Sequence, residues 1–124
     1  MKIQLTGYPP YSSYTINPSK EVALALNQKK IGRATVRTLI LPLSFGRAFD
    51  ILRRDIDTHC PDAITSLGLL PFTFAIQIEK FAVNILDTEG YPDEDGLAPR
   101  DEPIIKEAPA AYFSTLPVRR SQRI

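Results

Sequence analysis

The sequence predicts an α/β domain built on a mixed, mostly parallel, twisted sheet. Segments with strand and helix periodicity alternate in the order strand, helix, strand, helix, strand. Such connections are almost always right-handed crossovers between parallel strands. The length of 124 residues, with 44% hydrophobic and 23% charged residues, is typical of one globular domain. We therefore interpret residues 1–124 as a single domain.

The charge and the cysteine content exclude several classes of partner. The formal net charge is +1, so the chain has no bulk attraction for nucleic acid or for acidic membranes. Its apolar runs are broken within about eight residues, which is too short to span a bilayer. Cys60 is the single cysteine, so no internal disulfide can form, and this favours a reducing, cytoplasmic location. We expect neither a nucleic-acid nor a membrane partner.

Three segments within the first 68 residues have the composition and alternation of strands. They are Lys2–Gly7, Ala34–Leu43 and Ala63–Gly68. In a parallel sheet, ligands bind beyond the carboxyl ends of the strands. The loops that follow these strands are Tyr8–Tyr14, Leu43–Phe45 and Gly68–Phe72. The sequence therefore predicts a binding pocket where these three loops meet.

Two helices are expected between the strands. The first begins at Asn17, a good N-cap residue, with Pro18 at the first helical position. The second begins at Ser44 and ends at His59–Cys60–Pro61. Its apolar stripe is expected to contain Phe45, Phe49, Leu52 and Ile56, with Asp55 among the charged residues on the outer face.

The stretch Gly68–Asp87 has the pattern of two strongly apolar strands. Apolar residues alternate with others in Phe72–Ile78 and again from Phe81 to Leu86, so we expect a hairpin-like pair that makes the sheet mixed. Glu79 lies at the join, where its carboxylate needs a partner if it is buried. After this pair, Thr88–Glu107 reads as a surface loop. The segment 112–117 is expected to lead into a final helix, capped by Ser114 or Thr115, that runs to Ile124.

One motif within the stretch 68–87 consists of Gly68, Pro71, Ile76, Glu79, Lys80, Ala82, Asn84, Ile85 and Asp87. Its spacing resembles the glutamate motif of pyroglutamyl peptidase I, the C15 family of cysteine peptidases. The family's opening loop resembles Thr6–Tyr11 followed by Asn17–Ser19, its second strand and turn resemble Leu41–Pro42 with Phe45, and a later segment resembles Ala110–Pro117. These segments span the chain in order.

The resemblance implies a three-layer α/β/α sandwich and a cysteine exopeptidase that removes N-terminal pyroglutamate from peptides. In this family a cysteine thiolate attacks, a histidine moves the proton and a glutamate orients the histidine, with no metal or cofactor. Glu79 stands at the position of that glutamate. Tyr8 and Tyr11 replace two phenylalanines that sandwich the lactam ring, and Leu43 and Leu69 are further substrate-binding candidates. Family members tend to form homo-oligomers.

The departures from the family imply that this chain is inactive alone. The family's cysteine and histidine lie C-terminal to the segment matched by Leu116–Pro117, so the chain resembles a truncated N-terminal portion of an incomplete domain. His59 and Cys60 cannot act as base and nucleophile, because adjacent side chains diverge. They are also expected at the opposite edge of the sheet from the pocket. Ser12–Ser13 replaces two glycines, which readily adopt positive φ.

Other interpretations of the sequence remain open. The chain could be a non-catalytic binding protein or a homologue that assembles with a complete enzyme, or a truncated gene model of an active enzyme. Without the family motif, Glu79 would be an ordinary solvated turn residue, and Tyr8 and Tyr11 would be loop aromatics that pack on the sheet. Strand edges left uncovered by the missing portion predict poor solubility or self-association.

Overall fold

The computed structural model describes residues 1–118 and divides into two compact units. Unit 1 comprises Met1–Pro71 with Asp93–Asp95, and unit 2 comprises Phe72–Pro92 with Gly96–Ile124. The final helix expected up to Ile124 lies largely outside the described residues. None of the helices in the described part of the chain is long and apolar enough to cross a membrane.

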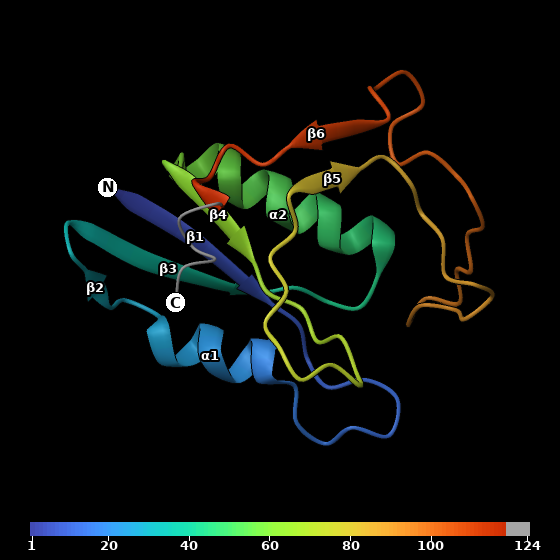
Figure 1. Ribbon diagram of the computed structural model, residues 1–124, viewed down its shortest axis with the longest axis horizontal. Helices are drawn as coiled ribbons and strands as arrows, with labels where there is room; N and C mark the ends of the chain where they lie inside the picture. The colour runs from blue at the N-terminus through green and yellow to red at the C-terminus, as the bar shows by residue number, and fades with distance from the viewer. Residues whose placement is uncertain (119–124) are drawn as a thin grey trace. The chain divides into compact units, whose positions relative to one another are not determined.

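Unit 1 is a four-stranded sheet with the order β2-β3-β1-β4 (Figure 1). Its strands are β1 (Lys2–Gly7), β2 (Lys30–Ile31), β3 (Ala34–Ile40) and β4 (Ala63–Ser66). β1 pairs in parallel with both β3 and β4, and β2 pairs antiparallel with β3. The predicted α/β class with a mostly parallel sheet is confirmed. The sheet is mixed because of β2, which the sequence analysis did not predict.

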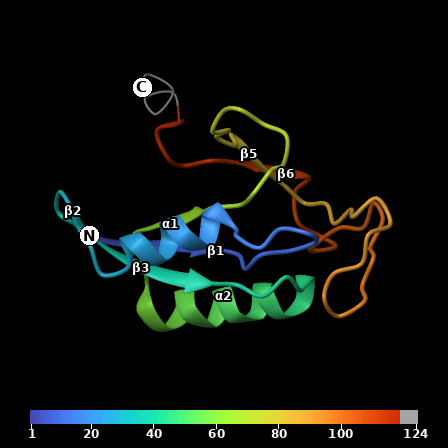
Figure 2. The same cartoon turned by 90° about the horizontal axis from the view of Figure 1, so that it is seen from below.

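Two helices cover opposite faces of this sheet (Figure 2). They are α1 (Pro18–Leu26) and α2 (Phe45–His59), and they begin at the predicted caps Asn17 and Ser44. The Asn17 side chain accepts a hydrogen bond of 3.0 Å from the Ser19 backbone N–H, and the Ser44 hydroxyl accepts one of 3.2 Å from the Arg47 N–H. Each cap satisfies a backbone donor that the first turn of a helix leaves free.

The α1 face of the sheet carries the apolar core. Leu5, Ala23 and Val36 are buried together, and Ile3, Leu26, Ile40 and Leu67 pack against them. Gly7 lies where the first turn of α1 touches β1, and a Cβ at this position would be 2.5 Å from the carbonyl oxygen of Ser19. Only glycine therefore allows α1 to approach β1 this closely.

The α2 face of the sheet is polar, and here one prediction was wrong. Asp55 is buried rather than on the outer face, and Phe49 of the expected apolar stripe is 46% exposed. The reason is Arg37 on β3, whose Nη2 lies 2.8 Å from Asp55 Oδ1. The apolar stripe of a helix gives no information about a cation on the sheet that faces it. The sequence pattern therefore predicted the wrong buried face for this helix.

Gln4 and Thr6 are also buried on this polar face, at 1% and 0% exposure. Neither Gln4 amide atom nor the Thr6 hydroxyl has a hydrogen-bond partner among the described residues. An unpaired buried amide costs free energy, because water no longer hydrogen-bonds to it.

We therefore expect Gln4→Leu to raise the free energy of unfolding by about 1–2 kcal/mol, since it removes an unpaired buried amide. Urea unfolding followed by circular dichroism measures this change. As a control, Gln77→Leu alters an exposed glutamine and should shift the free energy by less than about 0.5 kcal/mol. A loss of stability in Gln4→Leu would show that the amide is hydrogen-bonded in solution.

Unit 2 contains a two-stranded antiparallel sheet of β5 (Phe81–Val83) and β6 (Ala111–Phe113). The Asn84 side chain extends this pairing, because it accepts from the Ile105 N–H at 2.9 Å and donates to the Ile105 carbonyl at 2.8 Å. The predicted hairpin was wrong: Phe72–Ile78 forms no strand, and β5 pairs with a segment expected to lead into a helix. Most of the predicted loop Thr88–Glu107 does lack regular structure.

The segment before β5 exposes an unusual amount of apolar surface. Phe72, Phe74 and Ile76 are each at least 96% exposed, so the alternating pattern reflects apolar side chains that remain in solvent. Contiguous exposed apolar surface promotes association between molecules.

Replacing two of these side chains, in Phe74→Ser with Ile76→Ser, should reduce self-association of the chain. Sedimentation velocity at increasing protein concentration measures this, and the double variant should stay monomeric at concentrations where the wild type does not. Tyr91→Ser, which removes a single aromatic side chain that is 77% exposed, should leave association unchanged. A wild-type chain that is monomeric throughout would contradict the prediction.

Candidate functional site

Three loops leave the same edge of the unit 1 sheet, as predicted from the strand order. Backbone hydrogen bonds tie their first residues to β1: Leu41 N–H donates to the Gly7 carbonyl and Leu67 N–H to the Thr6 carbonyl, both at 2.9 Å. The loops that follow β1, β3 and β4 therefore start side by side. This edge is where ligands gather in open parallel sheets.

The loop after β1 is fixed by the start of α1. Tyr8 N–H donates to the Ser19 hydroxyl at 3.0 Å, and the Asn17 side-chain amide donates to the Pro9 carbonyl at 3.0 Å. Ser12 has a φ of 55°, so it adopts the left-handed conformation although it is not glycine. That conformation costs a non-glycine residue about 1–2 kcal/mol, which the surrounding loop contacts must offset.

Two of the predicted site residues are in direct contact. The Tyr11 hydroxyl donates a hydrogen bond of 3.0 Å to the Leu69 carbonyl, which joins the β1 loop to the β4 loop. The Tyr11 and Tyr14 rings meet edge to face, with centroids 5.7 Å apart. Burial raises the pKa of Tyr8, and burial and then the neighbouring Tyr14 raise the pKa of Tyr11. Both phenols therefore stay uncharged at neutral pH.

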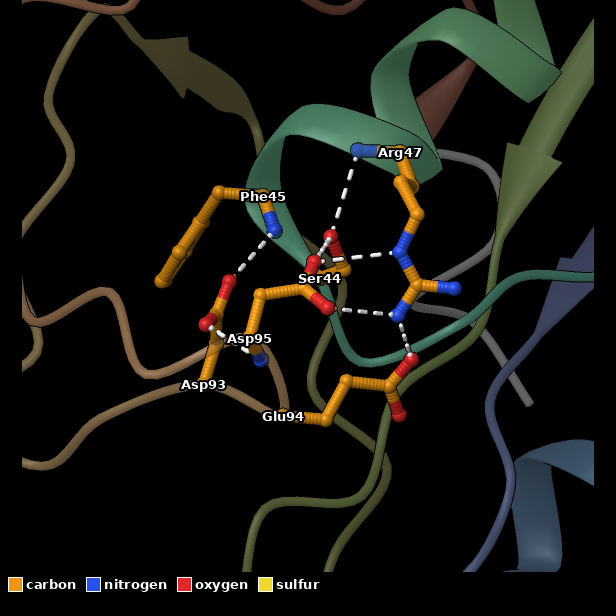
Figure 3. A network of polar contacts seen from close by, with 6 residues as sticks. All are labelled: Ser44, Phe45, Arg47, Asp93, Glu94 and Asp95. Carbon is orange, nitrogen blue, oxygen red and sulfur yellow. Dashed lines mark hydrogen bonds and ion pairs between the residues drawn. The ribbon is translucent and has the colours of Figure 1, made fainter.

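Leu43 is the candidate from the third loop. It is held by a segment whose composition predicts a plain surface loop. Its carbonyl accepts a hydrogen bond of 3.0 Å from the Glu94 N–H. Figure 3 shows the wider network: Asp93 accepts from the Phe45 N–H at 3.0 Å, and Asp95 accepts from the Ser44 hydroxyl. Leu43 is therefore anchored through its backbone next to the start of α2.

Arg47 completes this network. Its Nε lies 3.0 Å and its Nη2 2.9 Å from the two Asp95 oxygens, and Nη2 also contacts the Glu94 carboxylate. Hydrogen bonds from Arg47 and then Ser44 hold the pKa of Asp95 below its usual range. The available sequence signal was position 47 itself. A capping box would place Glu or Gln three positions after the N-cap, and the sequence has Arg47 there instead.

Glu79 lies in unit 2, where it is exposed and directly precedes Lys80 and β5. Among the described residues no group of three or more His, Cys, Asp or Glu side chains could hold a metal ion.

His59 and Cys60 lie at the other edge of the unit 1 sheet. Lys2, at the start of β1, donates its Nζ to the His59 carbonyl at 2.5 Å. His59 Nδ1 lies 3.3 Å from Asp55 Oδ1, while Cys60 is the exposed, left-handed C-cap of α2. Neither residue is near the loops that carry Tyr8 and Tyr11, which leave the opposite ends of the strands.

Comparison with known proteins identifies the family. The family model described as pyroglutamyl peptidase matches residues 1–123. The chain belongs to the pyroglutamyl peptidase family. It is 48% identical to the pyrrolidone-carboxylate peptidase of Halalkalibacterium halodurans over 118 residues, which cover 95% of this chain and 58% of that protein. It is 42% identical to the same enzyme of Pyrococcus furiosus, over 97% of this chain and 57% of that protein.

Solved structures of this family share the fold. A mutant pyrrolidone carboxyl peptidase from Pyrococcus furiosus matches with a TM-score of 0.92 and 42% identity, covering 97% of this chain and 57% of that one. The enzyme from Thermococcus litoralis matches with a TM-score of 0.92 and 40% identity, covering 96% and 54%. The chain thus spans little more than half the length of the family members it matches.

Ultraviolet difference absorbance during an alkaline titration checks the environment of the two loop tyrosines. Tyr8 and Tyr11 should ionise above the ordinary tyrosine value of 10.0, and Tyr8→Phe and Tyr11→Phe should each remove part of the late-titrating signal. Folding raises both pKa values. The two tyrosines therefore contribute fully to stability at pH values below the ordinary tyrosine pKa, and this contribution is lost as the pH rises through their pKa in the folded chain. If neither substitution changed the absorbance signal that titrates late, the partly buried placement of Tyr8 and Tyr11 would be wrong.

Proposed function

We propose that this chain binds the N-terminal pyroglutamyl residue of peptides through the loops at the carboxyl edge of the unit 1 sheet. The observation that supports this most directly is the hydrogen bond from Tyr11 to Leu69, which brings two candidate residues from separate loops together. Tyr8 and Leu43 complete the proposed site. We further infer that residues 1–124 belong to one domain, since the family model spans nearly all of them.

The chemistry of these side chains suits the ligand. A pyroglutamyl ring is a flat, uncharged lactam, and such a group stacks on aromatic faces and fits beside aliphatic side chains. The Tyr11 hydroxyl is already occupied by the Leu69 carbonyl, so its ring can present an apolar face as phenylalanine would. Both phenols are uncharged at neutral pH, so they bring no negative charge to the lactam oxygen.

We propose that Glu79 is the orienting carboxylate of an incomplete Cys-His-Glu triad. In such a triad the carboxylate fixes the tautomer of the histidine and stabilises its cation, while the thiolate attacks the carbonyl carbon. The chain has one cysteine and one histidine, and they lie at the far edge of the sheet from the tyrosine loops. The 124 residues alone are therefore proposed to bind pyroglutamyl peptides without cleaving them.

A second function is a partner in a mixed assembly with a complete pyroglutamyl peptidase. The exposed apolar side chains of Phe72, Phe74 and Ile76 favour it, because they offer a surface for association. In both cases we infer a cytoplasmic protein without a cofactor, on the grounds of its single cysteine and its family.

Release of a fluorophore from a pyroglutamyl amide tests the inactivity of the 124-residue chain. We expect no release, while a full-length family member assayed in parallel gives a strong signal. Calorimetry with uncleaved pyroglutamyl amide tests binding, which should be lost in Tyr11→Ala and kept in Glu79→Gln. Hydrolysis that disappears in Cys60→Ser would overturn our placement of Cys60, and absence of binding would refute the proposed function.

A further inference from the structure

An acidic segment from the loop after β5 forms hydrogen bonds and ion pairs with the start of α2. We call the set Ser44, Arg47 and Asp93–Asp95 the acidic clasp. Its acidic members lie some fifty positions along the chain from its basic one, yet all belong to unit 1. The acidic clasp contacts the same short connection that carries Leu43, because the Glu94 N–H donates to the Leu43 carbonyl. Figure 3 shows the side chains of the acidic clasp.

We propose that the acidic clasp positions Leu43 for ligand binding, with Arg47 and Asp95 as its positioning residues. This inference rests on the proposed function, since Leu43 is one wall of the proposed pyroglutamyl site. It concerns residues that touch the loop rather than the ligand.

The connection between β3 and α2 is held at both of its ends. At the β3 end, Leu41 N–H donates to the Gly7 carbonyl at 2.9 Å. At the α2 end, the Leu43 carbonyl accepts from the Glu94 N–H at 3.0 Å. The position of Leu43 is thus defined by β1 on one side and by the acidic clasp on the other.

The contacts within the acidic clasp depend on one another. The Ser44 hydroxyl accepts from the Arg47 N–H and at the same time donates to Asp95. The planar guanidinium of Arg47 contacts both Asp95 oxygens, a paired geometry that lysine cannot reproduce. Asp93 accepts a hydrogen bond from the Phe45 N–H, which has no partner within α2 because it lies at the start of the helix. The helix dipole favours an anion at this end.

The charged side chains of the acidic clasp are partly exposed, at 54% for Arg47, 40% for Glu94 and 38% for Asp95. Ion pairs with such exposure are weak and are screened by salt. A pyroglutamyl amide carries no charge, so its own contacts should depend little on salt. If the affinity for this ligand changes with salt, the change therefore reports on the acidic clasp. An acidic clasp that only stabilised the fold, far from the ligand, would not make the affinity depend on salt.

The test measures the dissociation constant of pyroglutamyl amide by calorimetry at low and high sodium chloride. For the wild-type chain we expect the constant to rise about two- to fivefold with salt, in keeping with exposed ion pairs. Arg47→Gln and Asp95→Asn should bind about two- to fivefold more weakly at low salt and lose the salt dependence. Arg53→Gln, an exposed arginine on the same helix, is the matched control and should behave as the wild type.

Wild-type affinity and salt dependence in both Arg47→Gln and Asp95→Asn would overturn the inference and leave the proposed function intact. If the wild-type chain binds no pyroglutamyl amide, the proposed function fails instead. Amide hydrogen exchange then tests whether the acidic clasp holds the connection that carries Leu43. The Phe45 and Glu94 N–H groups should exchange several-fold faster in Arg47→Gln than in Arg53→Gln. Equal exchange in the two variants would overturn the inference on its own.

Discussion

The first loop of the candidate site, which follows β1, depends on one steric constraint, the close approach of α1 to the end of β1. A Cβ at Gly7 would lie 2.5 Å from the Ser19 carbonyl oxygen, so this approach requires glycine. Because α1 begins there, the Ser19 hydroxyl and the Asn17 side chain reach the backbone of the next loop. The same contact therefore packs the first crossover and sets the direction in which Tyr8 and Tyr11 leave the sheet.

The two faces of the unit 1 sheet are held by different forces. Under α1 the contact is apolar and centred on Leu5, Ala23 and Val36. Under α2 the sheet presents buried polar groups, and α2 is tied by the Arg37–Asp55 ion pair near its C-terminal end and by the acidic clasp at its start. Screening weakens ion pairs and leaves apolar burial largely unchanged. The contacts that hold α2 are therefore partly electrostatic, and the start of α2 adjoins Leu43.

Sequence patterns failed where a partner distant in the chain decides the outcome. Alternation in Phe72–Ile78 shows which side chains could share a face, but a strand also needs a neighbour for its backbone hydrogen bonds. β5 finds that neighbour in Ala111–Phe113, whereas the segment Phe72–Ile78 is not part of a strand. Asp55 was misplaced for a similar reason, because Arg37 becomes its neighbour only when α2 lies on the sheet.

Local patterns and motifs in fixed order were enough to predict the class of fold, both helix caps, β1 and the family. It also indicated that the Tyr8–Tyr14 loop would meet the other loops at one edge, since parallel strands end together. Two contacts could not be predicted before the chain was folded, namely the hydrogen bond from the Tyr11 hydroxyl to Leu69 and the contact of Asp95 with Arg47. Such contacts join residues that no local periodicity relates, and they exist only when the chain brings their backbones together.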